Sequence, residues 1–142
     1  MIDAVTDRLN TQVTDLRGKA ETVAHLADLM RSGRLPENAS AIVVPLGFKG
    51  GKPGDATGLF TQDINEVIGV LLITSAHDKA GRKALKRIDP LIREVVSTLA
   101  GWAPEDVTGV FQVERGKLLS LHQGRMVFQI DFSITDQLRI SA

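Results

Sequence analysis

The stretch LFTQDINEVIGVLLITS, residues 59–75, is the longest strand-like segment of the chain. Its first half is polar, and its second half, residues 67–73, is apolar at successive positions and rich in β-branched side chains. A continuous apolar run of this kind is typical of a strand buried on both faces. We therefore predict one long strand over residues 59–75, with its first half exposed and its second half buried.

Alternating patterns elsewhere predict the partners of this strand. The run AIVVPL, residues 41–46, is apolar and β-branched, and its Pro45 indicates a bulge or an edge position. The last forty residues alternate between apolar and polar side chains, with turns expected near Gly116 and Gly124. Three antiparallel strands are therefore expected there. The last of them should present one face to the core: Met126, Phe128, Ile130, Phe132 and Ile134.

Two amphipathic helices are also predicted. Apolar residues recur at helical spacing over residues 2–16, and Gly18 follows them. A second helix should begin at an N-cap, Asp78, and end at Gly101, with Pro90 predicting either a kink or a second helical piece. Its expected buried stripe is Leu85, Ile88, Ile92, Val95 and Leu99. A short strand at residues 20–24 and a short helix at residues 25–31 complete the expectation.

This order of elements predicts an α+β fold with a single mixed or antiparallel sheet and helices packed on one face. The 142 residues are a usual length for one domain, and no linker or repeat divides them. We therefore expect residues 1–142 to form a single domain.

Composition excludes several function classes. Lys and Arg (17) balance Asp and Glu (17), so no overall charge attracts nucleic acid or an anionic membrane. The absence of cysteine excludes disulfides, thiolate zinc sites and iron–sulfur clusters. Residues 1–9 lack a signal-peptide pattern, and the apolar run at residues 67–73 is too short to span a bilayer. No secretion and no membrane insertion are expected.

A glycine-rich stretch, residues 47–58, is predicted to be a long loop. It resembles a phosphate-binding loop but has one spacer residue too few, and Pro53 stands where a hydroxyl and a backbone N–H would be needed. The three histidines, His25, His77 and His122, are isolated from one another in sequence. We therefore predict no catalytic residue, no metal site and no cofactor, and a protein that is not an enzyme.

A small nucleotide- or nucleic-acid-binding domain is the alternative. It would use the loop at residues 47–58 or the basic face of the second helix, residues 79–87. That face carries Lys79, Arg82, Lys83, Lys86 and Arg87. A solvated helix face is the simpler interpretation of these charges.

Two short segments, IVVPLG at residues 42–47 and LAGWAP at residues 99–104, belong to the ordered series of predicted helices, strands and glycine-rich stretch described above. The whole series resembles the tail terminator, or tail completion, proteins of long-tailed, siphovirus-like bacteriophages, and the similarity covers nearly the whole chain. The resemblance implies a structural virion protein without enzymatic activity, assembled in the host cytoplasm. It implies a hexameric ring that caps the tail tube protein, ends tube polymerisation and meets the head–tail connector protein. DNA would pass through the lumen without specific binding.

The interface residues are our own interpretation of the sequence, because the family has no invariant motif to transfer. We expect the loop at residues 47–58 to be mobile in the free subunit and ordered by a partner. Its lysines would align the loop against acidic groups of the partner across the interface. The polar half of the long strand would be available to a neighbouring subunit. The predicted interface residues are Phe48, Lys49, Lys52, Asp55, Phe60, Gln62, Asp63 and Glu66. Trp102, which follows the helix end, is predicted to seal the core.

Overall fold

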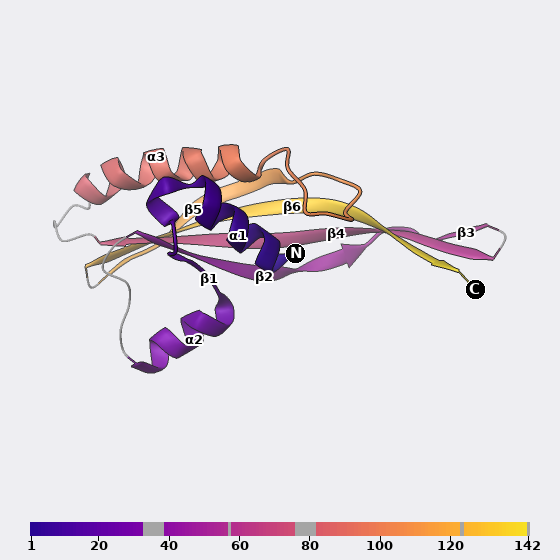
Figure 1. Cartoon of the computed structure of the whole chain (residues 1–142), viewed down its shortest axis with the longest axis horizontal. Helices are drawn as coiled ribbons and strands as arrows, with labels where there is room; N and C mark the ends of the chain where they lie inside the picture. Colours follow the sequence, from indigo (N-terminus) through magenta and orange to yellow (C-terminus); the bar gives the residue numbers. More distant parts are fainter. Residues whose placement is uncertain (33–38, 57, 76–81, 123, 142) are drawn as a thin grey trace.

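A computed structural model describes residues 1–32, 39–56, 58–75, 82–122 and 124–141. Its strands form one mixed sheet in the order β1–β2–β4–β6–β5, and β3 pairs with the far end of β4 (Figure 1). Only β1 and β2 are parallel, and all other neighbours are antiparallel. The predicted α+β class with one mixed sheet is confirmed. The strands are β1 (Ala20–Thr22), β2 (Ser40–Gly50), β3 (Gly54–Ala56), β4 (Leu59–Ser75), β5 (Gln112–His122) and β6 (Arg125–Ser141).

Strands β4 and β6 form the axis of the molecule. They pair along their full 17 residues, from Leu59 opposite Ser141 to Ser75 opposite Arg125. The strand predicted at residues 59–75 is therefore confirmed at both ends. The predicted core side of β6 is confirmed too, since Met126, Ile130, Phe132 and Ile134 are buried and Phe128 packs against them.

The prediction of a long loop at residues 47–58 is wrong. β2 continues through the bulge between Pro45 and Gly47 as far as Gly50, and residues 54–56 form β3. Glycine is depleted in strands because it has no side chain to pack, so its abundance by itself favours a loop. At Gly50 the missing side chain makes room, because a Cβ would lie 2.7 Å from the Gln62 amide nitrogen. The bulge predicted from Pro45 is confirmed.

The C-terminal region contains two strands rather than the predicted three. Gly116 does not form a turn, because it lies inside β5 opposite Ile130. A Cβ at this position would lie 3.0 Å from the ring of Phe128, so glycine allows that ring to pack over the strand. β5 also carries two register irregularities, between Val113 and Arg115 and between Leu118 and Ser120.

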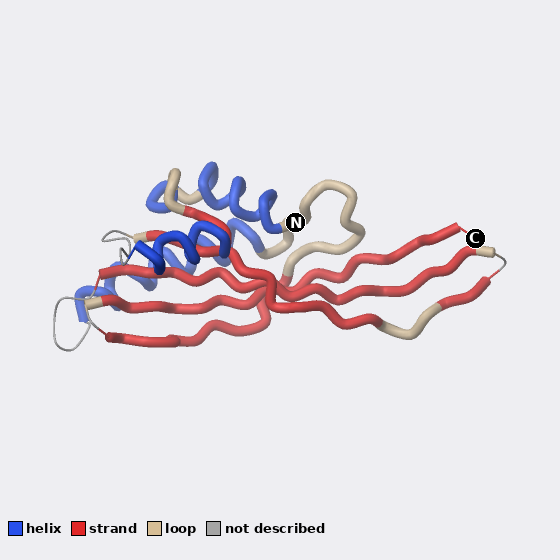
Figure 2. Tube along the Cα trace, turned by 90° about the horizontal axis from the view of Figure 1, so that it is seen from below, coloured by secondary structure: helices blue, strands red, loops and turns tan. Residues whose placement is uncertain are grey.

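Helices α1 (Ile2–Gln12) and α3 (Arg82–Leu99) cover one face of the sheet, while α2 (Val23–Ser32) stands on the other side, next to β1 (Figures 1 and 2). A 3₁₀ turn, η1 (Thr14–Leu16), follows α1. The predicted N-terminal helix and the short strand and helix after it are thus confirmed, with shifted ends. The core lies between α1, α3 and the inner face of the sheet, and its helical residues are Val5, Leu9, Ala84, Ile88, Leu91, Val95 and Leu99.

The predicted stripe of α3 is confirmed at Ile88, Val95 and Leu99, which are buried, and Ile92 packs against the core. The prediction for Leu85 is wrong, because this residue is 52% exposed and Ala84 is buried beside it. The helix also continues through Pro90, so no second helical piece begins there. The expected N-cap at Asp78 and the basic residue Lys79 lie outside the described residues.

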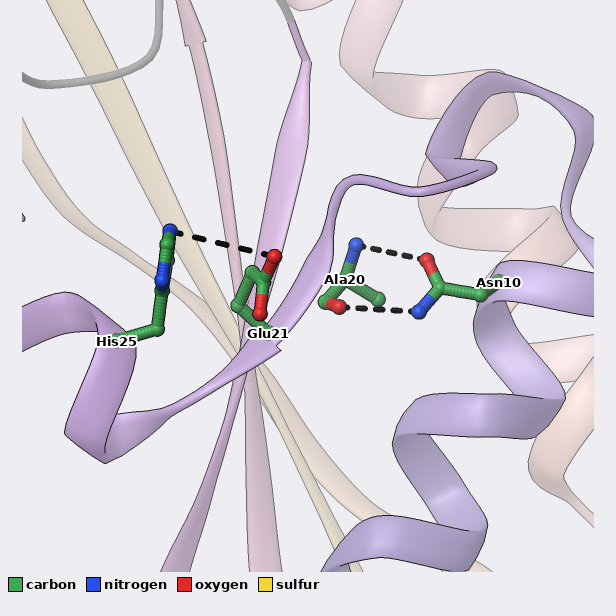
Figure 3. A network of polar contacts seen from close by, with 4 residues as sticks. All are labelled: Asn10, Ala20, Glu21 and His25. Atoms are coloured by element: carbon green, nitrogen blue, oxygen red, sulfur yellow. Dashed lines mark hydrogen bonds and ion pairs between the residues drawn. The ribbon is translucent and has the colours of Figure 1, made fainter.

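Asn10 ties α1 to β1 (Figure 3). Its side-chain amide donates to the Ala20 carbonyl oxygen at 3.0 Å, and the Ala20 N–H donates to its Oδ1 at 2.9 Å. On the other side of β1, His25 lies 3.9 Å from the Glu21 carboxylate, and the two side chains are 45% and 40% exposed. His25 is therefore a surface histidine.

Trp102 closes one end of the core. α3 ends at Leu99, and Gly101 follows it with a φ of 79° in the left-handed region. The Trp102 ring stacks on Phe111 with 6.1 Å between centroids. The Arg8 guanidinium lies 4.6 Å from the centre of the Trp102 ring. Phe111 in turn meets Phe132 edge to face, which links the ring to the central sheet.

Candidate assembly interface

The sheet extends well beyond the helices as a narrow, twisted projection with the C-terminus at its tip (Figures 1 and 2). We call this projection the arm and define it as residues 47–56, 58–66 and 135–141. β4 is its middle strand, with β2 and then β3 on one side and β6 on the other. The arm is therefore hydrogen-bonded internally but stands free of the core.

One face of the arm is apolar. Directly paired residues project to the same side of a sheet, so Phe60 and Ile140 lie together, as do Gln62 with Leu138 and Phe48 with Glu66. The exposed fractions are 74% for Phe48, 55% for Ile140, 42% for Leu138 and 38% for Phe60. Large side chains on this face are thus left open to solvent in the single chain.

The opposite face of the arm is polar. The Thr135 hydroxyl donates to Asn65 at 3.3 Å, and the Gln137 amide donates to Asp63 at the same distance. Arg139 donates to the Gln137 side-chain oxygen at 2.7 Å. These contacts satisfy the polar face, so the arm is amphipathic.

A second exposed apolar cluster lies along β5 and the segment before it. We call it the β5 margin, and it consists of Val110, Val113, Leu118, Leu119 and Leu121, which are 41–55% exposed. Val113, Leu118 and Leu121 pair with Phe132, Phe128 and Met126, which places them on the helix-covered face of the sheet. The helices leave this outer edge open.

The described residues thus present two exposed apolar surfaces, and sequence comparison identifies the family of the chain. The family model described as phage tail terminator protein matches residues 2–142, essentially the whole chain. This chain belongs to the phage tail terminator family. The resemblance drawn from residues 42–47 and 99–104 is therefore confirmed, and the tail terminator is a structural component of the phage tail. Among curated proteins no sequence matches the chain significantly.

The predicted interface residues of this tail terminator all lie on the arm. Lys49 lies opposite Asn65 in the β2–β4 ladder, while Lys52 is exposed in the β2–β3 connection. Asp55 lies in β3 opposite Phe60, and its side chain is outside the description. The remaining residues divide between the two faces: Phe48, Phe60, Gln62 and Glu66 on the apolar side and Asp63 on the polar side.

One part of the prediction is wrong. The polar half of β4 is no free edge, because β2, β3 and β6 occupy both of its sides. A neighbouring subunit therefore cannot add a strand to β4 at this position. Gln62 has an internal role, since its amide donates to the Gly51 carbonyl oxygen at 2.9 Å.

Sequence reasoning also missed two arm residues, Leu138 and Ile140. The signal was present, because the alternation of Ile134, Asp136, Leu138 and Ile140 continues beyond the last core residue. The β5 margin was missed because the sequence around Gly116 predicts a turn, which would divide β5 in two.

Several polar groups on β5 and β6 of the tail terminator are engaged in structural contacts. Asp131, whose side chain is 6% exposed, accepts hydrogen bonds from Arg115 at 2.9 Å and from Gln129 at 2.6 Å. Ser133 bonds to Glu114 beside them. Within the described residues, no group of three or more His, Asp or Glu side chains could hold a metal ion.

Asp136 joins the arm to the loop before β5. Its carboxylate accepts hydrogen bonds from the backbone N–H of Gln137 at 2.8 Å and from the N–H and hydroxyl of Thr108 at 3.2 and 2.9 Å. The bond from Gln137, with those from Thr108, lowers the pKa of Asp136 below its ordinary value because each stabilises the charged form.

The basic helix face is partly structural. Arg87 donates to the Ser75 carbonyl oxygen at 2.9 Å, which ties α3 to the end of β4. Lys83 and Lys86 are exposed, and the side chains of Arg82 and His122 are outside the description. His77 lies outside the described residues. None of the described helices is long and apolar enough to cross a membrane.

Proposed function

We propose that this tail terminator caps the tail tube as a ring of identical subunits, six in number as in the family resemblance. The ring ends tube polymerisation and presents a surface to the head–tail connector. Its place is the virion tail, after assembly in the host cytoplasm. All of residues 1–142 serve this role as one domain.

The observation that carries the proposal is the amphipathic arm. Phe48 is 74% exposed and Ile140 is 55% exposed on a projection that has no core of its own. This exposure contributes no stability to a single chain. Exposed apolar surface of this kind marks protein–protein contact sites. The eight predicted residues, with Leu138 and Ile140 added, are the contact set we propose.

Catalysis is not part of this proposal. Asp131, Ser133 and Asp136 are held by structural hydrogen bonds, and the family is a family of structural proteins. The nucleotide-binding alternative loses its basis, because residues 47–50 are paired in a strand and cannot cradle a phosphate. The balanced charge of the chain suits DNA passage through a lumen rather than DNA retention, since each neutralised phosphate adds affinity.

Negative-stain electron microscopy and mass photometry test the proposal. The purified chain, alone or mixed with assembled tail tube, should give closed rings of a single stoichiometry, and rings should stop further tube growth. A chain that stays monomeric at high concentration and also with tube present would refute it.

A further inference from the structure

Most of the exposed large apolar side chains of the described residues fall into two clusters. The apolar face of the arm holds Phe48, Phe60, Leu138 and Ile140, and the β5 margin holds its five residues. Among the described residues the others are Val23, Leu46, Leu85 and Leu59, and Leu59 lies on the polar face of the arm. The two clusters therefore need covering by something outside the described fold of one subunit.

The two clusters cannot cover each other within one chain. β6 runs unbroken through both regions, pairing with β5 over residues 125–133 and with the arm half of β4 over residues 135–141. The two clusters therefore lie one after the other along β6. A strand that is continuously paired cannot fold back to bring them together. The occupant of each cluster must be another molecule.

The dimensions of the two clusters agree. The arm half of β4, residues 59–66, spans about 26 Å, and residues 113–121 of β5 span about 30 Å at roughly 3.3 Å per residue. The two surfaces are therefore similar in length.

The arm carries acidic side chains, and one lysine stands at the edge of β5. The described charged side chains on the apolar face of the arm are acidic, Glu66 and Asp136. Lys117 is exposed on β5, and although it points to the other face of the sheet, it stands on the edge strand. A lysine has a long stem, so its ammonium group can reach the rim of an arm that lies along this edge.

The contact is made through side chains rather than by strand addition. β5 is an edge strand, but its two register irregularities and its charged residues oppose backbone pairing with another strand. The apolar side chains of the margin remain available on its face. The arm of a neighbour would lie against this face.

We propose that the apolar face of the arm of one subunit packs on the β5 margin of the next subunit, a second copy of this chain. This inference rests on the proposed ring. Because the two surfaces differ, the contact is head-to-tail, and repetition of such a contact closes a ring or grows a filament.

The buried area explains why a ring is favoured over a pair. The arm face, about 26 Å long and three strands or about 14 Å wide, covers on the order of 370 Å². A stable two-protein interface buries about 800 Å² on each partner. A single contact falls short of that area, whereas in a closed ring every subunit makes the contact twice.

Cross-linking tests the contact, because the chain has no cysteine of its own. The variant with both Ile140→Cys and Leu118→Cys, treated with a short bismaleimide, should give a ladder of covalent multimers up to the full ring. Each single variant should give no ladder, and an equal mixture of the two should stop at dimers. A control with Ile140→Cys and Val23→Cys should not ladder, since Val23 is 43% exposed but lies outside both clusters.

Charge variants give an independent readout. Ile140→Lys and Leu118→Lys should each lose the ring signal in mass photometry with an unchanged thermal melt, while Val23→Lys keeps it. Should one of them unfold, Leu138→Ser or Leu121→Ser takes its place.

The outcomes separate this inference from the proposed function. Two results would overturn the arm–margin contact and leave the ring intact: rings that persist in both charge variants, or cross-links that join position 140 to the tube protein instead of to position 118. A wild-type chain that forms no ring, alone or on the tube, would overturn both.

Discussion

Replacing Trp102 by alanine should destabilise the subunit without touching either exposed cluster. The indole ring of Trp102 stacks on the Phe111 ring with 6.1 Å between centroids, lies 4.6 Å from the Arg8 guanidinium, and packs against the core. Its removal leaves a gap where α3 ends and the sheet begins. The change therefore acts on folding first.

The magnitude follows from these contacts. Truncating a buried Trp to Ala costs about 3–5 kcal/mol, and the partial exposure of Trp102 places it near the lower end, at about 3 kcal/mol. The stacked pair accounts for about 1 kcal/mol of that and the cation–π contact for about 0.5–1 kcal/mol. For a chain of this size, about 3 °C per kcal/mol gives a fall in melting temperature of about 10 °C.

Circular dichroism is the assay, because Trp102 is the single tryptophan and its loss removes the fluorescence signal. Trp102→Phe keeps a ring against Phe111 and should recover most of the stability. An unchanged melting temperature combined with lost ring assembly would refute the reasoning and make Trp102 an interface anchor instead.

Three further predictions concern the arm and its attachment. Lys49→Glu with Lys52→Glu should change stability by within about 0.5 kcal/mol, because both side chains are exposed, while ring assembly on the tube falls in a complementation assay. Asn10→Ala removes two hydrogen bonds to the β1 backbone and should cost about 2 kcal/mol in a urea melt, with faster amide exchange in β1. The carboxylate of Asp136, whose pKa is lowered chiefly by the Gln137 N–H, stabilises the fold above the ordinary pKa of aspartate. That stabilisation is lost as pH falls through the lower folded pKa, so the urea midpoints of wild type and Asp136→Asn should differ at pH 7 and converge in acid.

Each of these predictions has a contradicting result. Normal assembly by the double lysine variant would remove the lysines from the interface, and a large drop in its melting temperature would make them part of the fold. An Asn10→Ala variant with wild-type exchange in β1 would show that β2 alone holds that strand. A constant difference between wild type and Asp136→Asn from pH 7 to acid would show that the charge of Asp136 is not what stabilises the arm.

Local pattern determined the main elements of this tail terminator. The apolar, β-branched run at residues 67–73 favours a strand buried on both faces, and the alternation along β6 indicates which of its sides faces the core. The helical spacing over residues 2–16 likewise required a partner surface. These signals depend on periodicity, which each segment carries by itself.

Only the tertiary structure decided what depends on a partner distant in sequence. Residues 47–50 form a strand because residues 64–67 pair with them, and Gly116 stays in β5 because the Phe128 ring needs its space. At the start of α3 the packed neighbours bury Ala84 and leave Leu85 exposed. The two exposed clusters followed from the same cause, since strand pairing carries β4 and β6 past the helices and leaves β5 at the edge. Sequence supplies the propensity of each segment, but burial and exposure are properties of the packed neighbours.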